Sequence, residues 1–572
     1  MDSMPTLELI RVFDQPGPRY TSYPTADHFA EAFDAEKQAW WLDNRTLRQP
    51  GQPVTVYVHI PFCESICHYC ACNRIGTRDH ARAVAYLQTL KQEIRLYAAH
   101  LHRDVRISQL HLGGGTPTFF SDDELAELLA TLDAEIGLQP QAECSIEIDP
   151  RTVDNTRLTN IRRMGFDRIS LGVQDLDPAV QVAIHRIQPE EMLVGLMEHA
   201  RTLDFKSINI DLVYGLPKQT LETLAHTLDR IAALRPGRMA IYGYAHLPER
   251  FKAQRLIHRE DLPDQAMRMA MVQLAIQKLN QAGYRYIGMD HFALPDDDLA
   301  IALERGTLRR NFMGYTAMPG DDLIGLGVSA ISAIGPSYSQ NHRELKPWRQ
   351  AIEAGRLPTA RGIELRGDDT LQRAVIMELI KNDVKPRDIM TREAFENAIT
   401  VDMGVGGSSN TVLHLTAIAH EAGIELPAPL FDEISRRTPY LTKLSPAGKH
   451  HMQDLNEAGG LPAVMKELSR KGLIHLDALT VTGTVAERIK NAKIVRPDVI
   501  RTVDDPYRKQ GGLAILQGNL APDYAVVKAS AVAEDMLVYK GTAKCFSSEE
   551  AGVNAIMAGE IHDGDVVVIR YE

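Results

Sequence analysis

Four of the six cysteines in the chain fall within ten residues, at Cys63, Cys67, Cys70 and Cys72. The first three have the spacing C-x3-C-x2-C and follow an apolar segment at 54–60 directly. Three thiolates on a four-iron cluster leave one iron open to a ligand that the protein does not supply. An open iron can bind a substrate group and deliver an electron to it. The spacing therefore predicts an iron–sulfur centre that carries out redox chemistry.

Two other interpretations of the cysteine loop stand beside this one. A structural zinc site would use Cys72 or His68 as its fourth ligand, and a redox thiol pair would use two of the thiols. Zinc sites often combine two separated pairs of ligands, and no second pair occurs elsewhere in the chain. Cys144 falls within a predicted strand and is interpreted as a small core residue.

The segments around the loop predict a parallel α/β fold. Helix-like segments, such as 81–101 and 220–236, separate apolar segments of strand length. Strand–helix alternation at this spacing is typical of parallel βαβ units, and hence of an open sheet or a full or partial TIM-type barrel. The predicted strands are 54–60, 108–115, 144–150, 167–174, 207–217, 239–248 and 284–293.

Polar residues gather at the carboxyl ends of the predicted strands, where barrel enzymes carry their chemistry. They are His59 and Cys63, then the run Gly113–Thr116, then Glu147, Asp149, Gln174, Asp175 and Asp211. Each also has a structural interpretation: the glycines as a tight turn, and Glu147 and Asp211 as caps or salt-bridge partners. Because one edge of one sheet would collect all of them, we expect a shared site there.

The pattern of predicted helices and strands changes after about residue 380. Residues 390–427 have the pattern of helices broken by a Gly/Ser turn, and short strands with Gly, Asp and Pro turns follow from about 475. We therefore predict an N-terminal segment at 1–50, a barrel at 51–380 and a tail at 382–572. The tail is predicted to be α+β, helical over 382–472 and β-rich over 473–572.

Composition narrows the function classes. The formal net charge is −12, and no basic stripe with interleaved aromatics occurs, which argues against a nucleic-acid partner. The N-terminus lacks the apolar segment of a signal peptide, and no apolar stretch is long enough to span a bilayer. The expected location is the cytoplasm, without insertion into a membrane.

Several motifs resemble the oxygen-independent coproporphyrinogen III oxidases, a family of radical S-adenosylmethionine (SAM) enzymes. The resemblance runs in register from about residue 10 to about 380. It implies a partial (βα)6 radical SAM barrel behind an N-terminal segment that covers the substrate. The motifs are GPRYTSYPTADHF (17–29), YVHIPFC (57–63), CAC (70–72), HLGGGTPT (111–118), SIEIDP (145–150), SLGVQD (170–175), NIDLVYGLPKQT (209–220), YAHLP (244–248), IGMDHFA (287–293) and LGVSAIS (326–332).

The resemblance also implies which residues hold the cofactors. The ligands of a [4Fe-4S] cluster would be Cys63, Cys67 and Cys70, whereas Cys72 would matter for activity without binding the cluster. A first SAM would contact Tyr57, Gly114, Glu147 and Ile331. A second SAM would contact Tyr69, Gly115, Thr116, Gln174, Arg186, Asp211 and Ala245. Taken alone, Arg186 would be interpreted as a solvated surface charge. No residue is assigned as a catalytic acid or base.

The implied activity is that of an oxidoreductase of heme (porphyrin) biosynthesis. Two propionates of coproporphyrinogen III would be oxidatively decarboxylated to vinyls, giving protoporphyrinogen IX. The C–H bond that must break is far too weakly acidic for a side-chain base, whereas a SAM-derived 5′-deoxyadenosyl radical can take the hydrogen atom. The implied partners are the porphyrinogen, an electron donor for the cluster and a final electron acceptor.

The tail resembles an internal part of dihydroxy-acid dehydratase, through DVKPRDIMTREAFENAI (383–399), GGSSNTVLHLTAIAHEAG (406–423) and GGLAILQGNLAPDYAVVK (511–528). In that family the cluster cysteines lie upstream of this part and the catalytic serine downstream, and the tail has only Cys545. We therefore expect no dehydratase activity, and a chimeric chain joined near Leu379 to Asp383. An alternative hypothesis is that the fused chain binds SAM or porphyrin without turnover, because the C-terminal domain of the oxidase family is replaced.

Overall fold

The computed structural model describes residues 23–318, 322–381, 384–445 and 447–571. The chain divides into two compact units, Met1–Met377 and Glu378–Glu572. The larger unit contains the cysteine loop, and the smaller unit spans the whole predicted tail, 382–572. Among the described residues, no helix is long and apolar enough to cross a membrane.

The larger unit is built on a twelve-stranded sheet with the order β16-β15-β14-β13-β1-β4-β5-β6-β7-β8-β10-β9. Six consecutive strands of it, β1-β4-β5-β6-β7-β8, are parallel to one another. This confirms the partial (βα)6 barrel, whose sheet is open because further strands extend both sides. The six are β1 (Val54–Ile60), β4 (Ile107–Gly114), β5 (Leu138–Ile148), β6 (Arg168–Gln174), β7 (Ser207–Tyr214) and β8 (Arg238–Gly243).

The two ends of the sheet differ from the parallel centre. β13 (Asp322–Leu326) is parallel to β1, and β14 (Ile331–Ile334), β15 (Ser337–Asn341) and β16 (Thr359–Glu364) continue the sheet antiparallel. At the other end, the prediction of a single strand at 284–293 is wrong. Gly288 and Met289 have φ values of 134° and 49°, so the chain turns there and forms β9 (Arg285–Gly288) and β10 (His291–Ala293) instead.

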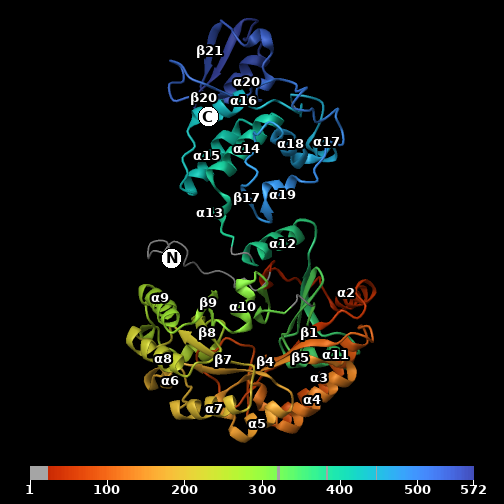
Figure 1. Cartoon of the computed structure of the whole chain (residues 1–572), viewed down its shortest axis with the longest axis vertical. Helices are drawn as coiled ribbons and strands as arrows, with labels where there is room; N and C mark the ends of the chain where they lie inside the picture. Colours follow the sequence, from red (N-terminus) through yellow and green to blue (C-terminus); the bar gives the residue numbers. More distant parts are fainter. Residues whose placement is uncertain (1–22, 319–321, 382–383, 446, 572) are drawn as a thin grey trace. The chain divides into compact units, whose positions relative to one another are not determined.

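Helices cover the outer face of the parallel strands (Figure 1). α3 (Ala81–Ala98) matches the predicted 81–101 segment and buries Leu87, Leu90 and Ile94 in the main core. α4 (Asp122–Glu135) begins with a capping box between Ser121 and Glu124. The remaining helices are α2 (Ala35–Arg48), α5 (Asn155–Arg163), α6 (Pro178–Ala183), α7 (Glu190–Thr202), α8 (Leu221–Ala233), α9 (Gln265–Gln281), α10 (Asp298–Glu304) and α11 (Leu345–Glu353), with α12 (Asp368–Lys381) at the boundary between the units.

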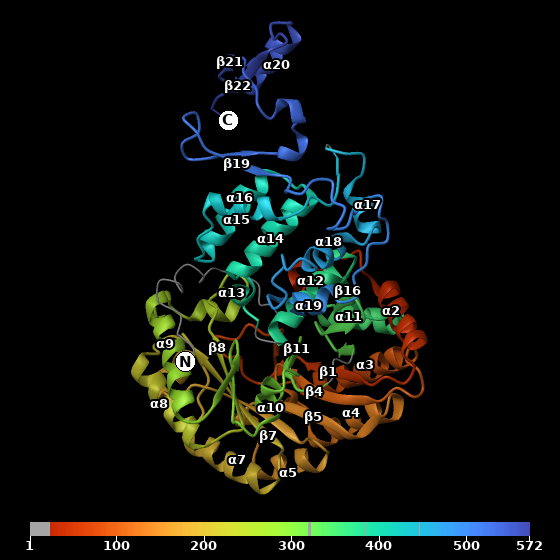
Figure 2. The same cartoon turned by 45° about the horizontal axis from the view of Figure 1, so that its top comes forward.

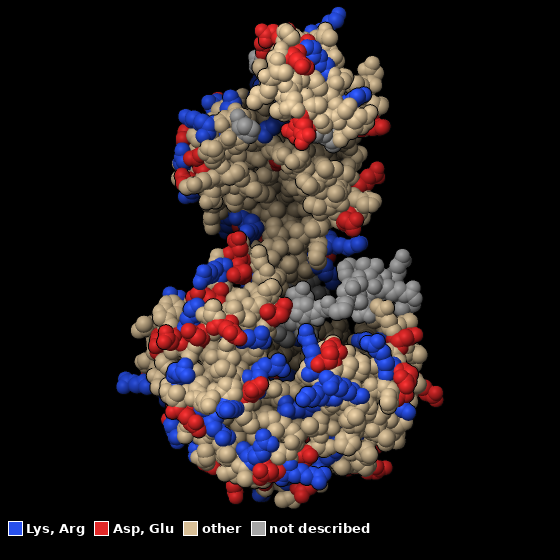
Figure 3. All heavy atoms as spheres, turned by 180° about the vertical axis from the view of Figure 1, so that it is seen from behind, with Lys and Arg blue, Asp and Glu red and all other residues tan. Residues whose placement is uncertain are grey.

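Two two-stranded sheets of the larger unit lie outside the large sheet. β2 (Phe62–Cys63) and β3 (Ile75–Gly76) are parallel and enclose the cysteine loop. β11 (Arg309–Asn311) and β12 (Gly314–Thr316) form an antiparallel hairpin. Seen from behind, the surface of the larger unit carries basic and acidic side chains interspersed with one another (Figure 3).

The smaller unit begins with helices, as the sequence predicts. α14 (Arg392–Val405) ends at Gly406, whose φ of 68° gives the left-handed end typical of glycine, and α15 (Asn410–Glu421) follows the Gly/Ser turn. The other helices are α13 (Pro386–Ile389), α16 (Ala428–Arg437), α17 (Met452–Glu457), α18 (Gly460–Ser469), α19 (Val485–Ile489) and α20 (Glu549–Met557).

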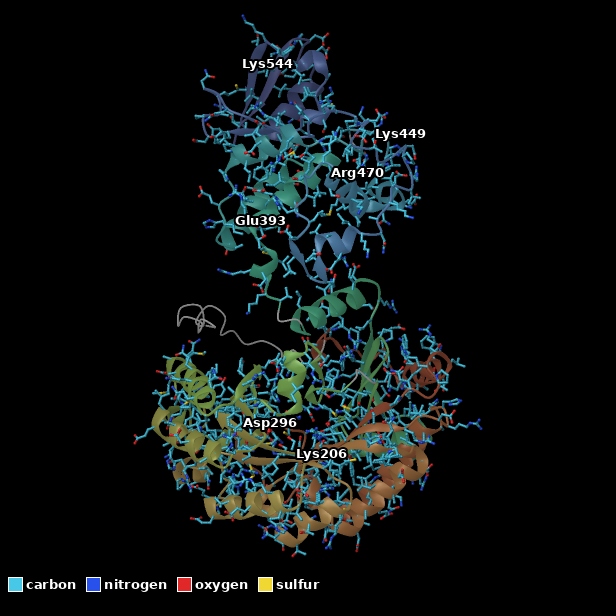
Figure 4. All side chains as sticks on the ribbon, in the orientation of Figure 1. Lys206, Asp296, Glu393, Lys449, Arg470 and Lys544 are labelled. Carbon is cyan, nitrogen blue, oxygen red and sulfur yellow. The ribbon has the colours of Figure 1, made fainter. Side chains whose placement is uncertain are left out.

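Short strands recur through the described part of the last hundred residues. Lys544 on β21, labelled in Figure 4, forms an ion pair of 2.9 Å with Asp565 on the parallel strand β22. Several large apolar side chains of this region are exposed, among them Leu520, Val538 and Met557. The strands are β17 (Leu479–Thr480), β18 (Gly483–Thr484), β19 (Ala514–Leu516), β20 (Ala525–Val527), β21 (Thr542–Phe546) and β22 (Asp565–Ile569).

Candidate radical SAM site

A cavity of about 700 Å³ lies at the carboxyl ends of the parallel strands in the larger unit. Ligand pockets for small molecules and cofactors span roughly 300–1,000 Å³, so this cavity has the volume of a binding site. Most of the residues that the sequence singled out meet here. Its lining includes Cys63, Cys67, Tyr69, Cys70, Gly114, Gly115, Thr116, Glu147, Gln174, Arg186, Asp211 and Ala245.

The three sulfur atoms of the C-x3-C-x2-C motif each receive a hydrogen bond. Thr116 Oγ1 donates to Cys63 Sγ (3.4 Å), and Arg186 Nη1 donates to Cys67 Sγ (3.4 Å). The backbone N–H of Cys72 donates to Cys70 Sγ (3.4 Å). Burial raises the pKa of Cys63 to about 11, whereas a hydrogen bond from the Cys72 thiol lowers the pKa of Cys70 to about 6. Cys72 therefore lies next to Cys70 and stabilises the thiolate form of its sulfur by hydrogen bonding.

The structure also bears on the other interpretations of the loop. The His68 ring stacks on His185 with centroids 5.0 Å apart and is not part of the cavity lining. Within the described ranges, no three His, Cys, Asp or Glu side chains converge as they would on a single metal ion. In a four-iron cluster each cysteine binds a different iron, so the ligands need not converge. Cys144 is buried in the main core, as predicted.

The glycine turn packs against the end of β1 and the residues that lead from it into the cysteine loop. Gly114 has φ of 121°, and a Cβ there would lie 2.8 Å from the His59 ring. A Cβ on Gly115 would lie 2.7 Å from the backbone of Pro61. The glycines are therefore required by close contact within the protein, whatever ligand the turn also approaches.

Glu147, on β5, is held at the edge of the cavity. The backbone N–H of Gly114 donates to Glu147 Oε2 (3.1 Å), and His111 Nε2 lies 3.4 Å from Oε1. Burial raises the pKa of Glu147, but the His111 contact and the Gly114 bond outweigh it, so the net pKa lies below the usual value. Glu147 is therefore an ionised carboxylate at neutral pH.

Arg186 is buried and fully engaged. Its guanidinium donates to Asp149 Oδ2 (3.0 Å) and to the carbonyl oxygen of Gly172, besides Cys67. Arg151 also pairs with Asp149 (2.7 Å) and donates to Cys67 Sγ (3.6 Å). Burial raises the pKa of Asp149, but Arg151 and Arg186 more than offset this and lower it overall. The surface-charge interpretation of Arg186 is excluded, and Arg151 is a sulfur partner that sequence reasoning missed.

Gln174 and Asp211 complete the far side of the cavity. Gln174 has φ of 71°, a left-handed conformation that costs a non-glycine residue about 1–3 kcal/mol and often marks functional sites. Asp211 accepts hydrogen bonds from Ser170 Oγ (2.7 Å) and Asn209 Nδ2 (2.9 Å). Burial raises the pKa of Asp211 to about 6, and the charge of Glu147 contributes to the rise.

Two of the predicted SAM contacts are not part of the cavity lining. Tyr57 stacks on His111, with centroids 5.8 Å apart, and hydrogen-bonds with His59 Nδ1 (3.0 Å), so it lies behind the lining. Ile331 begins β14 and packs against the cluster of Phe29, Tyr338 and Leu365. Their proposed roles stay predictions.

The parallel strands and the three-cysteine loop at their carboxyl ends define a radical SAM enzyme, and residues 57–231 match the family model of the radical SAM superfamily. The chain is 49% identical over 375 residues to oxygen-independent coproporphyrinogen III oxidase from Pseudomonas aeruginosa, covering 65% of this chain and 81% of that protein. The Escherichia coli oxidase is 47% identical, with 66% and 81% covered. The chain belongs to the oxygen-independent coproporphyrinogen III oxidase family.

A solved structure agrees with this assignment. Coproporphyrinogen III oxidase from Escherichia coli, described as a radical SAM enzyme, aligns with a TM-score of 0.61 and 46% identity over 64% of this chain and 83% of that one. The remaining part of the chain matches a different family. Residues 369–488 match the N-terminal model, and 498–572 the C-terminal model, of dihydroxy-acid/6-phosphogluconate dehydratases.

Proposed function

We propose that the chain converts two propionates of coproporphyrinogen III to vinyls without oxygen, giving protoporphyrinogen IX. The observation that carries this proposal is the meeting of three motif cysteines with Glu147, Gln174 and Asp211 around one cavity, in a chain of this family. Its relatives are named as coproporphyrinogen III oxidases, and that substrate is taken from them.

The residues present fit a [4Fe-4S] cluster and SAM. Cys63, Cys67 and Cys70 would hold the cluster, since their sulfurs line one cavity and each accepts a hydrogen bond that stabilises a thiolate. When bound, cluster and SAM supply an electron and a 5′-deoxyadenosyl radical, which breaks a C–H bond that no side chain could deprotonate.

We infer places for two SAM molecules. The first would lie near Glu147 and the Gly114 backbone, with Tyr57 and Ile331 further back. The second would lie among Tyr69, Gly115, Thr116, Gln174, Arg186, Asp211 and Ala245. A carboxylate is available in each place, Glu147 in one and Asp211 in the other, to pair with the cationic groups of SAM. The walls of the barrel would keep water from the reacting groups.

An anaerobic product assay tests the function. The full-length chain would be incubated with coproporphyrinogen III, SAM, a low-potential reductant and an electron acceptor, and the products identified by mass spectrometry. We expect loss of two carboxyl groups per molecule, dependent on SAM. Porphyrinogen binding and SAM cleavage without any vinyl product would instead support the hypothesis of a chain that binds but does not turn over.

The pH dependence of SAM cleavage should report on Asp211. Because the pKa of this carboxyl is about 6, its charged form is complete only well above pH 6 and is lost as the pH falls through that value. We expect the apparent KM for SAM to rise severalfold between pH 7.5 and 5.5 in the native chain, and this rise to be absent in Asp211→Asn. If the KM for SAM still rises in Asp211→Asn as it does in the native chain, Asp211 is not part of the SAM site.

A further inference from the structure

The β11–β12 hairpin forms one wall of the cavity. Arg310, Phe312, Met313 and Gly314 of this hairpin line the cavity together with the cysteine loop and the strand ends. In Figure 2 β11 is drawn on the inner side of the curved sheet.

Aromatic contacts fix the hairpin at two points. The Tyr315 ring meets His291 of β10 edge-on with centroids 5.2 Å apart, and the Phe312 ring meets Tyr338 of β15 in the same way at 5.2 Å. Because β10 and β15 lie toward opposite ends of the large sheet, the hairpin spans the space between them.

Arg310 stands out among the arginines of the cavity because, in the described part of the chain, its guanidinium forms neither a hydrogen bond nor an ion pair. Its guanidinium carbon lies 5.2 Å from the centre of the Tyr315 ring, and its Nε is buried without a hydrogen-bond partner. In the part of the chain that the structure describes, no carboxylate forms an ion pair with Arg310. The other two arginines of the lining are engaged: Arg186 with Asp149, and Arg74 with the carbonyl oxygens of Cys67 and Cys72.

A half-buried guanidinium without an anion is costly, so its position favours a ligand that brings one. Guanidinium groups bind carboxylates through two parallel hydrogen bonds, with geometric specificity. The lining also contains the carboxylates Glu147 and Asp211, which would repel an anionic ligand on their own side. The hairpin therefore offers the place in this cavity where a carboxylate would be attracted.

We propose that Arg310 binds a propionate carboxylate of the substrate and thereby determines which porphyrinogens the enzyme accepts. This inference rests on the proposed function, because coproporphyrinogen III carries one propionate on each of its four pyrrole rings. Phe312 and Met313, next to Arg310 in the lining, provide apolar contact for the ring system. Arg310 is thus a specificity-determining residue that orients the macrocycle.

The test is equilibrium binding of coproporphyrin III, the stable oxidised form of the substrate, to the full-length chain by fluorescence. We expect Arg310→Gln to raise the Kd about tenfold, the loss typical of one charge-assisted pair. The Kd of Arg310→Lys should lie between those of the native chain and Arg310→Gln, because lysine keeps the charge but lacks the two parallel N–H donors of a guanidinium. Arg309→Gln is the matched control: Arg309 is the exposed neighbour on the same strand, and its Kd should stay within about twofold of native.

The tetramethyl ester of coproporphyrin III separates carboxylate recognition from apolar contact. It should bind the native chain and Arg310→Gln equally. A Kd for coproporphyrin III in Arg310→Gln within twofold of native, at an unchanged melting temperature, would overturn the inference. If native chain makes vinyl product while that Kd is unchanged, only this inference fails. If no vinyl product forms but the Kd still depends on Arg310, the proposed function fails and the carboxylate site stands.

Discussion

Cys67→Ala is expected to abolish cluster assembly and to lower reductive SAM cleavage by more than about a hundredfold. Removing even a residue that only hydrogen-bonds to a metal ligand typically lowers metal affinity or activity by about 10–100-fold. Cys67 is buried, and its sulfur accepts hydrogen bonds from both Arg186 (3.4 Å) and Arg151 (3.6 Å). Among the described residues, neither Cys63 nor Cys70 receives hydrogen bonds from two arginines, so the Cys67 sulfur is the most strongly held of the three.

The measurements are iron and sulfide content after anaerobic reconstitution, and 5′-deoxyadenosine formed per chain. Cys144→Ala is the matched control, because Cys144 is buried in the core and is not part of the cavity lining. It should keep its iron and its SAM cleavage. A Cys67→Ala chain that cleaves SAM as fast as the native chain would refute the assignment of the ligands.

Arg186→Gln is expected to have the second largest effect. The glutamine would lose the ion pair with Asp149 and the bond to Cys67 Sγ, and would leave Arg151 as the remaining partner of a buried carboxylate. Breaking a buried ion pair typically lowers the free energy of unfolding by about 3–5 kcal/mol. We expect a lower melting temperature together with a loss of SAM cleavage of roughly 10–100-fold.

Two comparisons separate the roles of Arg186. Arg186→Lys keeps the charge but loses the several N–H donors of the planar guanidinium. Compared with Arg186→Gln, it should restore the melting temperature more fully than it restores SAM cleavage. Arg163→Gln changes an exposed arginine at the end of α5, and should leave both the melting temperature and SAM cleavage unchanged. Native SAM cleavage in Arg186→Gln would show that the contact with Cys67 has no part in the chemistry.

Much of the fold follows from local sequence patterns. The apolar run of β-branched residues at 54–60 matches the bounds of β1, because a strand buried on both faces needs no alternation. The prediction failed at 284–293, where two left-handed backbone conformations at Gly288 and Met289 interrupt an apolar pattern. Conformations of this kind depend on packing that a single sequence does not display.

The candidate site was predicted in composition but not in its contacts. The cysteine spacing and the strand ends identified most of the cavity lining, since parallel strands bring their carboxyl ends together. The ion pair of Asp149 with Arg186 was not predictable, because the two residues lie 37 positions apart and no periodicity connects them. Arg310 was not predicted as a site residue, because only the folded hairpin places it in the cavity.

The proposed cluster is tested most directly by electron paramagnetic resonance of the anaerobically reduced full-length chain, recorded before and after addition of SAM. We expect the signal of a reduced [4Fe-4S] cluster that changes when SAM binds, because Cys63, Cys67 and Cys70 leave one iron free. A protein that contains zinc without iron, or a cluster whose signal SAM does not alter, would contradict this proposal.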